Sequence, residues 1–559
     1  MNFDSGQKHS QRFWTVGEGV SPRPDARSGW GGGPGSDRAI LGAGCGIHPA
    51  SAVFSVRFLP RFLAAGLLAA LLLPGRPASG ARAVRDLAAT AQQGKEAMAA
   101  GRFDEAATLY AEVVQALPNE PGMRLNLGIA LAMAGRAREA VPHLEAALKL
   151  APDLLPASLF LGAAHVELGQ SAQAVKPLQT FLAAQPDHQD ARRMLADALL
   201  SLERCEPAAR HYRTLSQQAP QDPRAWYGLG RSYEGVAQDA FEELKVMAPQ
   251  SPYLLLLVAE GLVAQERDKS AFRLYREAID KQAGMAEAHE ALAQIYERSG
   301  HPDWAAVEHG KAQALPPPDC RSASLECEFR ATHYQAILEA TRSLRTAESR
   351  YWLSRAAGEL TREAFARLDR LPPSPEATLV RVQVLRAQRR YAESKEELQK
   401  GATAWPEDRR IQEDLATLLF IARDFEAARP ILEDLLKHEP ESAELNLLLG
   451  ETWLESRQPE KAVAHLERAV RRDPKRLRAR AVLGRAYLDA GEAARAVPHL
   501  EAALQTDEDG SLHFQLARAC RETGQTDRAN QALEKFQEIR RANEARAQSE
   551  KEEFAITPP

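Results

Sequence analysis

The sequence predicts an all-α protein built from a repeated helix-turn-helix unit. Proline recurs every 34 residues in two series: Pro118, Pro152, Pro186 and Pro220, and then Pro406, Pro440 and Pro474. The nine residues AVPHLEAAL occur twice, at 140–148 and at 496–504. The composition is rich in Ala, Leu, Glu and Arg and only 6% aromatic, which favours helices over strands. A fixed period of this length indicates a solenoid.

Other residues recur with the same period. The first three units contain Gly94, Gly101, Phe103, Ala106, Tyr110 and Pro118, then Gly128, Leu131, Gly135, Ala140, Leu144 and Pro152, then Gly162, Gly169, Ala174, Leu178 and Pro186. Two later units contain Gly450, Trp453, Ala462, Leu466 and Pro474, then Gly484, Tyr487, Gly491, Ala496 and Leu500. This pattern, across roughly residues 87–543, resembles the tetratricopeptide repeat (TPR). The resemblance implies a right-handed superhelix of about 13–14 units, two of them shortened.

Simple physical reasons account for the recurring positions. The glycine and the alanine of each unit are expected where its two helices cross, because a larger side chain would separate them. A second glycine allows the turn, and proline ends the unit. The repeated nine residues are therefore predicted to be the second helix of a unit. His143 and His499 lie between its apolar positions and are expected to face outward, without the partners that a metal site needs.

The first 83 residues are predicted to be a targeting segment rather than a folded domain. Residues 1–55 are rich in Gly, Pro and Ser and predict a disordered extension, or a translation start that lies near residue 53 or 56. In residues 56–83, Arg57 and Arg61 precede a twelve-residue apolar stretch that is followed by small residues, as in a signal peptide. An uncleaved membrane anchor is the alternative. The expected location is periplasmic or at the cell surface, and the bacterial assignment rests on the resemblance.

The remaining chain is expected to hold two arrays of repeats. Residues 84–318 and 349–543 form these arrays, and residues 319–348, which begin near three prolines, are expected to be an irregular, degenerate repeat. Residues 544–559 form a charged tail. Two units, at 227–249 and 351–373, lack about five residues compared with the period, which we expect to be missing from the turn between their helices.

The cysteines are too few for a fold held by disulfides. In an oxidising compartment Cys320 and Cys327 are expected to form a local disulfide. Free thiols are one alternative, and a zinc site with His309 and His333 is another, although the spacing of the two cysteines is wide for zinc. Cys205 and Cys520 are expected to be buried, and Cys45 lacks the preceding apolar run of a lipoprotein signal.

Catalysis and nucleic-acid binding are not expected. The sequence contains no P-loop, no G-x-S-x-G and no H-E-x-x-H motif, and no stretch outside the repeats is long enough for a catalytic domain. No cofactor or metal is predicted. The net charge is −5, and after the first 83 residues, which carry +5, the rest carries −10 without a basic block. Phosphate binding needs clustered Lys and Arg.

The first helices of the units are expected to line a concave groove. In the N-terminal array this groove is apolar, and its candidate partner-binding residues are Leu125, Ile129, Met133, Leu159 and Val166. In the C-terminal array the same positions are densely charged. An exposed apolar surface indicates a binding site, so we expect an amphipathic helix or apolar peptide as the ligand. Alternatively, the groove is filled by the array itself or by the N-terminal segment.

The predicted function is that of an exported scaffold or adaptor that binds protein or peptide partners. Contact with a membrane is expected only through an uncleaved signal sequence. The alternative is a structural component of an envelope polysaccharide or cell-wall machinery, for which the groove offers few aromatic side chains. Some TPR proteins bind C-terminal carboxylates through basic residues in successive units. Here Pro156 and Phe160 stand where the third unit would need basic residues, so this clamp is not predicted.

Overall fold

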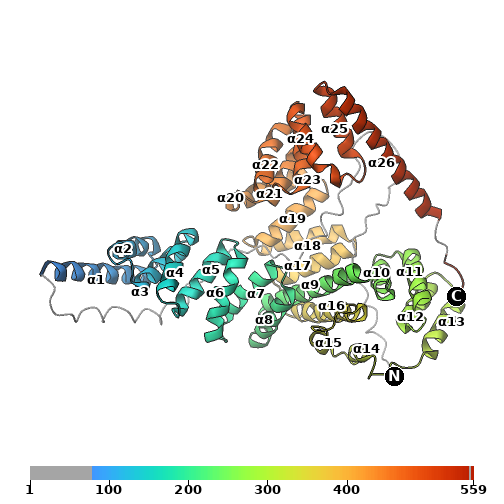
Figure 1. Ribbon diagram of the computed structural model, residues 1–559, viewed down its shortest axis with the longest axis horizontal. Coiled ribbons are helices and arrows are strands. Elements are labelled where there is room, and N and C mark those ends of the chain that lie inside the picture. Colours follow the sequence, from blue (N-terminus) through green and yellow to red (C-terminus); the bar gives the residue numbers. More distant parts are fainter. Residues whose placement is uncertain (1–77, 553–555) are drawn as a thin grey trace. The chain divides into compact units, whose positions relative to one another are not determined.

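The computed structural model describes residues 78–552 and 556–559, and the side chains of 86–545 and 556–559. The predicted extension and the apolar stretch of the predicted signal peptide lie outside these residues. All regular elements within the described ranges are helices, which confirms the all-α TPR fold (Figure 1). The described residues divide into an N-terminal unit, 78–240 with 353–372, and a C-terminal unit, which holds the remainder.

The N-terminal unit begins with four pairs of antiparallel helices. They are α1 (Ala78–Ala99), α2 (Phe103–Ala116), α3 (Pro121–Met133), α4 (Ala137–Leu150), α5 (Leu155–Glu167), α6 (Ser171–Ala184), α7 (Gln189–Ser201) and α8 (Cys205–Gln218). The first helix of each pair is called helix A and the second helix B. Each helix packs on the next, and α3, α5 and α7 also contact one another in series. The helices A therefore share one face of this unit.

The close crossing of helices A and B depends on glycine. A Cβ atom built on Gly128 would lie 2.6 Å from Cγ of Leu144, and one on Gly162 would lie 2.6 Å from Cγ of Leu178. Such distances are far inside van der Waals contact, so only glycine fits without movement of the leucine. The expected reason for the periodic glycine is confirmed.

The turn between helices A and B requires one residue with positive φ. Gly101, Gly135 and Gly169 supply it, with φ of 73°, 74° and 68°. Other units use a residue with a side chain, and Glu203 and Arg457 have φ of 56° and 58°. The left-handed conformation is costly for such residues, and the rest of the unit must hold it in place.

The C-terminal unit contains the other helix pairs and the degenerate repeat. Its helices are α10 (Pro252–Ala264), α11 (Asp268–Lys281), α12 (Ala286–Arg298), α13 (Pro302–Ala314), α14 (Ser324–Arg330), α15 (Tyr334–Ala340), α17 (Pro375–Ala387), α18 (Tyr391–Ala404), α19 (Arg409–Ile421), α20 (Phe425–His438), α21 (Ala443–Glu455), α22 (Pro459–Arg472), α23 (Leu477–Asp489), α24 (Ala493–Ala503), the 3-10 helix η3 (Leu504–Thr506), α25 (Ser511–Glu522) and α26 (Thr526–Glu552). The predicted degenerate repeat forms α14 and α15, which have seven residues each.

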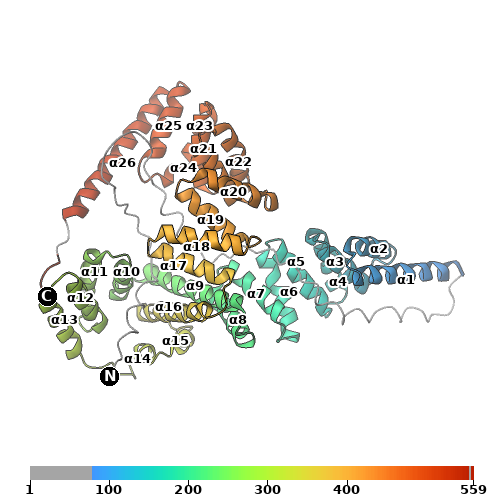
Figure 2. The ribbon, with the colours of Figure 1, turned by 180° about the vertical axis from the view of Figure 1, so that it is seen from behind.

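The two shortened units have lost the turn between their helices altogether. Each is one uninterrupted helix, α9 (Pro223–Met247) and α16 (Ala347–Asp369), which lie side by side in both views (Figures 1 and 2). The deletion removes the left-handed residue and its neighbours, so the backbone hydrogen bonds continue from helix A into helix B. The boundary between the two compact units falls within these helices.

The two long helices run antiparallel. In the N-terminal unit the hydroxyl of Ser354 donates to the carbonyl of Ala237 at 3.0 Å, and Gly230 lies against the ring of Phe365. A Cβ atom at Gly230 would come within 2.2 Å of that ring. The stretches at 227–249 and 351–373 resemble each other in sequence, and the structure pairs them.

Candidate functional site

The predicted groove residues lie on the helices A of two consecutive units. Ile129 and Met133 are on α3, Leu159 and Val166 are on α5, and all four are half-buried. Ile129 and Met133 pack against the core of the N-terminal unit and still reach solvent. Spacings of four residues on α3 and seven residues on α5 place each pair of apolar side chains on one face of its helix.

Leu125 differs from the other four candidates. Its side chain is only 9% exposed and belongs to the apolar core formed with α2, α4 and α5. A substitution of Leu125 would therefore disturb packing as well as any ligand contact. Experiments on the groove are better directed at Ile129, Met133, Leu159 and Val166.

The charged helices A of the C-terminal unit are joined by ion pairs. They join neighbouring units and have N–O distances of 2.7–3.3 Å. Five run between consecutive helices A: Arg410–Glu376, Arg386–Asp414, Arg478–Glu451, Arg485–Glu455 and Arg518–Asp489. In the sixth, Arg423 in the turn after α19 binds Glu455 at the end of α21. Partners are separated by 27–34 residues in sequence. The charges that the sequence places in this groove therefore bind one another across neighbouring units.

Two of these pairs are substantially buried. Burial raises the pKa of Glu451, and Arg478, which donates two hydrogen bonds to it at 2.9 and 3.1 Å, acts in the opposite direction. Burial alone would lower the pKa of Arg410, but its hydrogen bonds and charge interactions with Asp408 and Glu376 raise it. A buried bidentate pair has strict geometry, and removal of one partner leaves an uncompensated charge.

The composition of each groove was visible in the sequence, but the pairing was not. The pairing could have been predicted from opposite charges that lie about one repeat apart on helices A, because consecutive helices A are neighbours in a TPR array. Within the described residues, the charged side chains of α3 and α5, Arg124 and Glu167, take part in no comparable ion pair between helices A. The apolar character of this face is not masked by charge.

The histidines of the repeated nine residues are placed differently from the expectation. His143 and His499 are half-buried, and within the described residues the Nδ1 atom of each is buried without a hydrogen-bond partner. Burial lowers the pKa of both rings, assisted by the positive charges of Arg124 and Arg480 respectively. The expectation that they face outward was wrong, because helix B packs on helix A of its own unit and this contact covers part of each ring.

The arginines beside these histidines belong to a recurring contact. A side chain near the start of helix A donates to the carbonyl of the proline six residues earlier. Arg124 and Arg480 do so through Nε, to Pro118 at 2.5 Å and to Pro474 at 2.8 Å. Trp226 and Asn446 make the same contact at 2.9 Å. The periodic proline thus also supplies an acceptor that ties successive units together.

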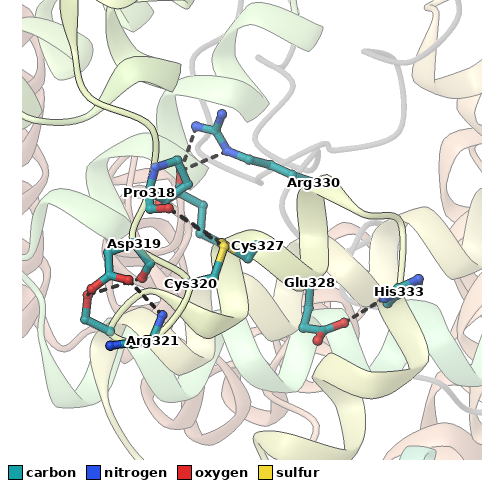
Figure 3. The surroundings of a disulfide bond; sticks show 10 residues. Pro318, Asp319, Cys320, Arg321, Cys327, Glu328, Arg330 and His333 are labelled. Carbon is teal, nitrogen blue, oxygen red and sulfur yellow. Dashed lines mark hydrogen bonds and ion pairs between the residues drawn. A yellow bond between two sulfur atoms is a disulfide. The ribbon is translucent and has the colours of Figure 1, made fainter.

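A disulfide bond joins Cys320, in the loop before α14, to Cys327 on α14 (Figure 3). The S–S distance is 2.05 Å and the two Cα atoms are 5.7 Å apart. The sulfurs are therefore not available as zinc thiolates. Of the two histidines considered for zinc, His309 pairs with Glu290 and His333 with Glu328. Cys205 and Cys520 are buried thiols.

Comparisons with known families identify the repeats. One tetratricopeptide-repeat family model matches residues 92–154, 161–206, 194–253 and 379–431, and a second matches 419–486 and 454–511. The chain therefore belongs to the tetratricopeptide-repeat family, whose fold is typically a non-catalytic scaffold for protein interactions. A search of curated proteins gives no match.

Several solved structures share the repeat architecture at low identity. Yeast Tom70 is 18% identical, with 83% of this chain and 94% of that chain covered and a TM-score of 0.28. A TPR protein of Parabacteroides merdae is 13% identical, with 60% and 99% covered and a TM-score of 0.29. MamA of Desulfovibrio magneticus is 19% identical, with 35% and 94% covered and a TM-score of 0.20.

Within residues 78–552 and 556–559, none of the helices combines the length and the apolar character needed to cross a bilayer.

Proposed function

We propose that the protein is an exported adaptor whose N-terminal groove binds an amphipathic helix or an apolar peptide of a partner protein. The observation that carries this proposal is the row of half-buried apolar side chains on α3 and α5, free of the ion pairs that join the helices A of the C-terminal unit. A helix laid into an apolar groove is one of the recurring modes of peptide recognition.

The contribution of such a surface is large enough for useful affinity. Removal of about 400 Å² of apolar surface from water contributes roughly 10 kcal/mol. Ordering of the peptide and loss of its free motion offset much of this gain. Met133 suits a ligand of variable shape, because its unbranched side chain adapts to irregular apolar surfaces.

The proposal can be tested by photocrosslinking in the cell that produces the protein. A photoreactive amino acid is placed at Ile129 or at Leu159 in the groove. Leu150, an exposed leucine at the end of helix B α4 that is 43% exposed, serves as the matched control. We expect one protein to be captured from both groove positions and not from the control position.

Capture of the same proteins from all three positions would contradict the proposal, because the groove would then have no preference. Crosslinks that form only within the protein itself would indicate that a segment of its own chain fills the groove. Crosslinked peptides identified by mass spectrometry give the segment of the partner, and its apolar residues should recur at three- and four-residue spacing.

The exported location is supported by the sequence of residues 56–83 and by the disulfide between Cys320 and Cys327, since disulfides persist in oxidising compartments. N-terminal sequencing of the mature protein tests this part. A new N-terminus shortly after residues 78–83 is the expected result, and a mature chain that keeps residue 56 would contradict cleavage.

A further inference from the structure

The last four residues of the chain dock on the C-terminal unit. The hydroxyl of Tyr296 on α12 donates to the carbonyl of Thr557 at 2.7 Å. Ile556 is half-buried, and the three residues that follow it are exposed. In both views the C-terminus lies beside α13, next to the helix that carries Tyr296 (Figures 1 and 2).

Tyr296 belongs to a set of three equivalent tyrosines. Tyr233, Tyr296 and Tyr487 occupy the same place on helix A of their units, and their hydroxyls reach helix B of the preceding unit. The hydroxyl of Tyr487 donates to Glu467 at 2.6 Å, and that of Tyr233 accepts from Arg213 at 3.0 Å. Each partner lies twenty residues before its tyrosine.

The residue twenty positions before Tyr296 is Arg276, which can only donate. Burial raises the pKa of Tyr296, and Arg276, which donates a hydrogen bond to the hydroxyl, acts in the opposite direction. Arg276 cannot take the role that Glu467 has for Tyr487, because a guanidinium has no acceptor. The carbonyl of Thr557 accepts the proton of the Tyr296 hydroxyl instead.

Aromatic side chains surround this point. The ring of Tyr296 meets Phe272 and Trp304 edge to face, both at 5.6 Å between centroids, and His301 stacks on Trp304 at 3.9 Å. Trp304 stands at the place in its unit where Arg495 stands in the unit of Tyr487. An aromatic surface therefore replaces the charged one found at the equivalent position.

The docked segment has the chemistry that such a surface prefers. Pro558 and Pro559 fix their own φ, and a proline also restricts the residue before it to an extended conformation. The Ile-Thr-Pro-Pro end therefore loses little conformational entropy when it binds. Proline-rich segments bind aromatic surfaces in this preorganised state.

We propose that the face formed by Tyr296, Trp304 and His301 is a docking surface for an extended chain end that carries consecutive prolines, and that its resident ligand is the protein's own C-terminus, residues 556–559. The tail folds back on α12, where Thr557 accepts the hydrogen bond of Tyr296. A partner with a similar extended, proline-containing segment must displace the tail. This surface is separate from the groove on α3 and α5, so the inference goes beyond the adaptor function proposed above.

Paramagnetic broadening in fluorine NMR tests the docking in the full chain. A nitroxide is attached to a cysteine that replaces Pro559, with Cys45, Cys205 and Cys520 changed to alanine, and the tryptophans carry fluorine. The fluorine resonance of Trp304 is identified by its absence from the spectrum of the Trp304→Phe variant. Thr557 is hydrogen-bonded to Tyr296, whose ring contacts Trp304. We therefore expect strong broadening of the Trp304 signal, and recovery of that signal when the nitroxide is reduced.

Two tyrosine variants decide the role of the hydroxyl. Tyr296→Phe keeps the ring and should lower the equilibrium constant for docking about 5- to 10-fold, the effect of one partly buried hydrogen bond, so that the Trp304 signal sharpens. Tyr487→Phe, at the equivalent place in another unit, should leave the broadening unchanged. Equal broadening in Tyr296→Phe and the parent chain would overturn the proposal, as would the absence of broadening in the parent.

Two further measurements cover other outcomes. A chain that lacks residues 556–559 keeps Tyr296, so its Trp304 resonance should shift even if Tyr296→Phe fails to fold; an unchanged resonance would contradict docking. In a mixture of fluorinated chains and separately nitroxide-labelled chains, the Trp304 signal should stay sharp. Broadening in that mixture would show that the tail comes from a second copy, which would overturn docking within one chain.

Discussion

A single missing methyl group determines how closely the two helices of a unit approach. Gly128 lies against Leu144, and Gly122, six residues earlier on the same helix, has open space at its Cβ position. The two glycines share a helix and differ in their surroundings. They therefore form a matched pair for measuring the cost of the crossing.

Gly128→Ala is expected to destabilise the protein by about 1–3 kcal/mol, the usual cost of an extra carbon in a packed core. Gly122→Ala should be neutral or slightly stabilising, because alanine favours a helix. Urea denaturation monitored by circular dichroism checks both. Equal effects of the two substitutions would show that the crossing is not set by this contact.

The histidines of helices B give a second prediction at this scale. Burial, with Arg192 and Arg210, lowers the pKa of His211 to about 4 from an unfolded value of 6.5. The unfolded chain thus binds more protons between these values, and the free energy of unfolding falls as the pH drops from 6.5 towards 4. His211→Gln should reduce this acid loss, as measured by urea midpoints at several pH values.

His309 supplies the contrast. Its hydrogen bond to Glu290 raises the pKa of the ring, so its contribution is full below 6.5 and is lost as the pH rises through the folded value. His309→Gln should therefore lower stability at acidic pH and have little effect at alkaline pH. The same direction of change in both variants would contradict the assignment of opposite pKa shifts.

At the scale of the element, the pairing of α9 with α16 is the least regular feature of the array. Gly230→Ala should destabilise the protein by about 1–3 kcal/mol, because the new Cβ atom meets the Phe365 ring. Phe365→Leu in the same chain should recover part of that loss. A double-mutant cycle checks this, with an expected coupling of about 0.5–3 kcal/mol. Purely additive effects would show that the two residues do not interact.

The sequence allowed the ordinary helices to be predicted and not these two. The regular units follow from glycine, alanine and proline at a fixed period, since each of these residues has a local reason for its place. The loss of about five residues from a unit was also visible. Whether such a unit keeps a shorter turn or becomes one helix depends on packing against a second helix, and in the N-terminal unit that helix comes from more than 100 residues away.

At the scale of the whole molecule, the two sets of helices A are stabilised differently. Charged residues on α17, α19, α21, α23 and α25 pair between successive units. On α3 and α5 the corresponding face is apolar and half-buried. The sequence could indicate this contrast in composition. It could not indicate that Leu125 is buried, that the charges pair, or that the C-terminus docks, because these depend on which neighbours each side chain meets.

The central claim is that the apolar face of α3 and α5 binds a partner. Once photocrosslinking has given the partner segment, the most direct measurement is its affinity for two double variants. Ile129→Glu with Leu159→Glu places two charges in the groove. Leu117→Glu with Leu150→Glu places the same two charges on leucines that are 38% and 43% exposed and lie outside the groove, at the end of helices B.

Titration calorimetry, with circular dichroism to verify that both variants keep their helices, gives the comparison. Two unpaired carboxylates in an apolar contact should cost about 3 kcal/mol, so the groove variant should bind more than about 100-fold more weakly than the parent. The control variant should bind within about threefold of the parent, the change expected for surface substitutions. Equal affinities for the two variants would contradict the claim that this groove is the binding site.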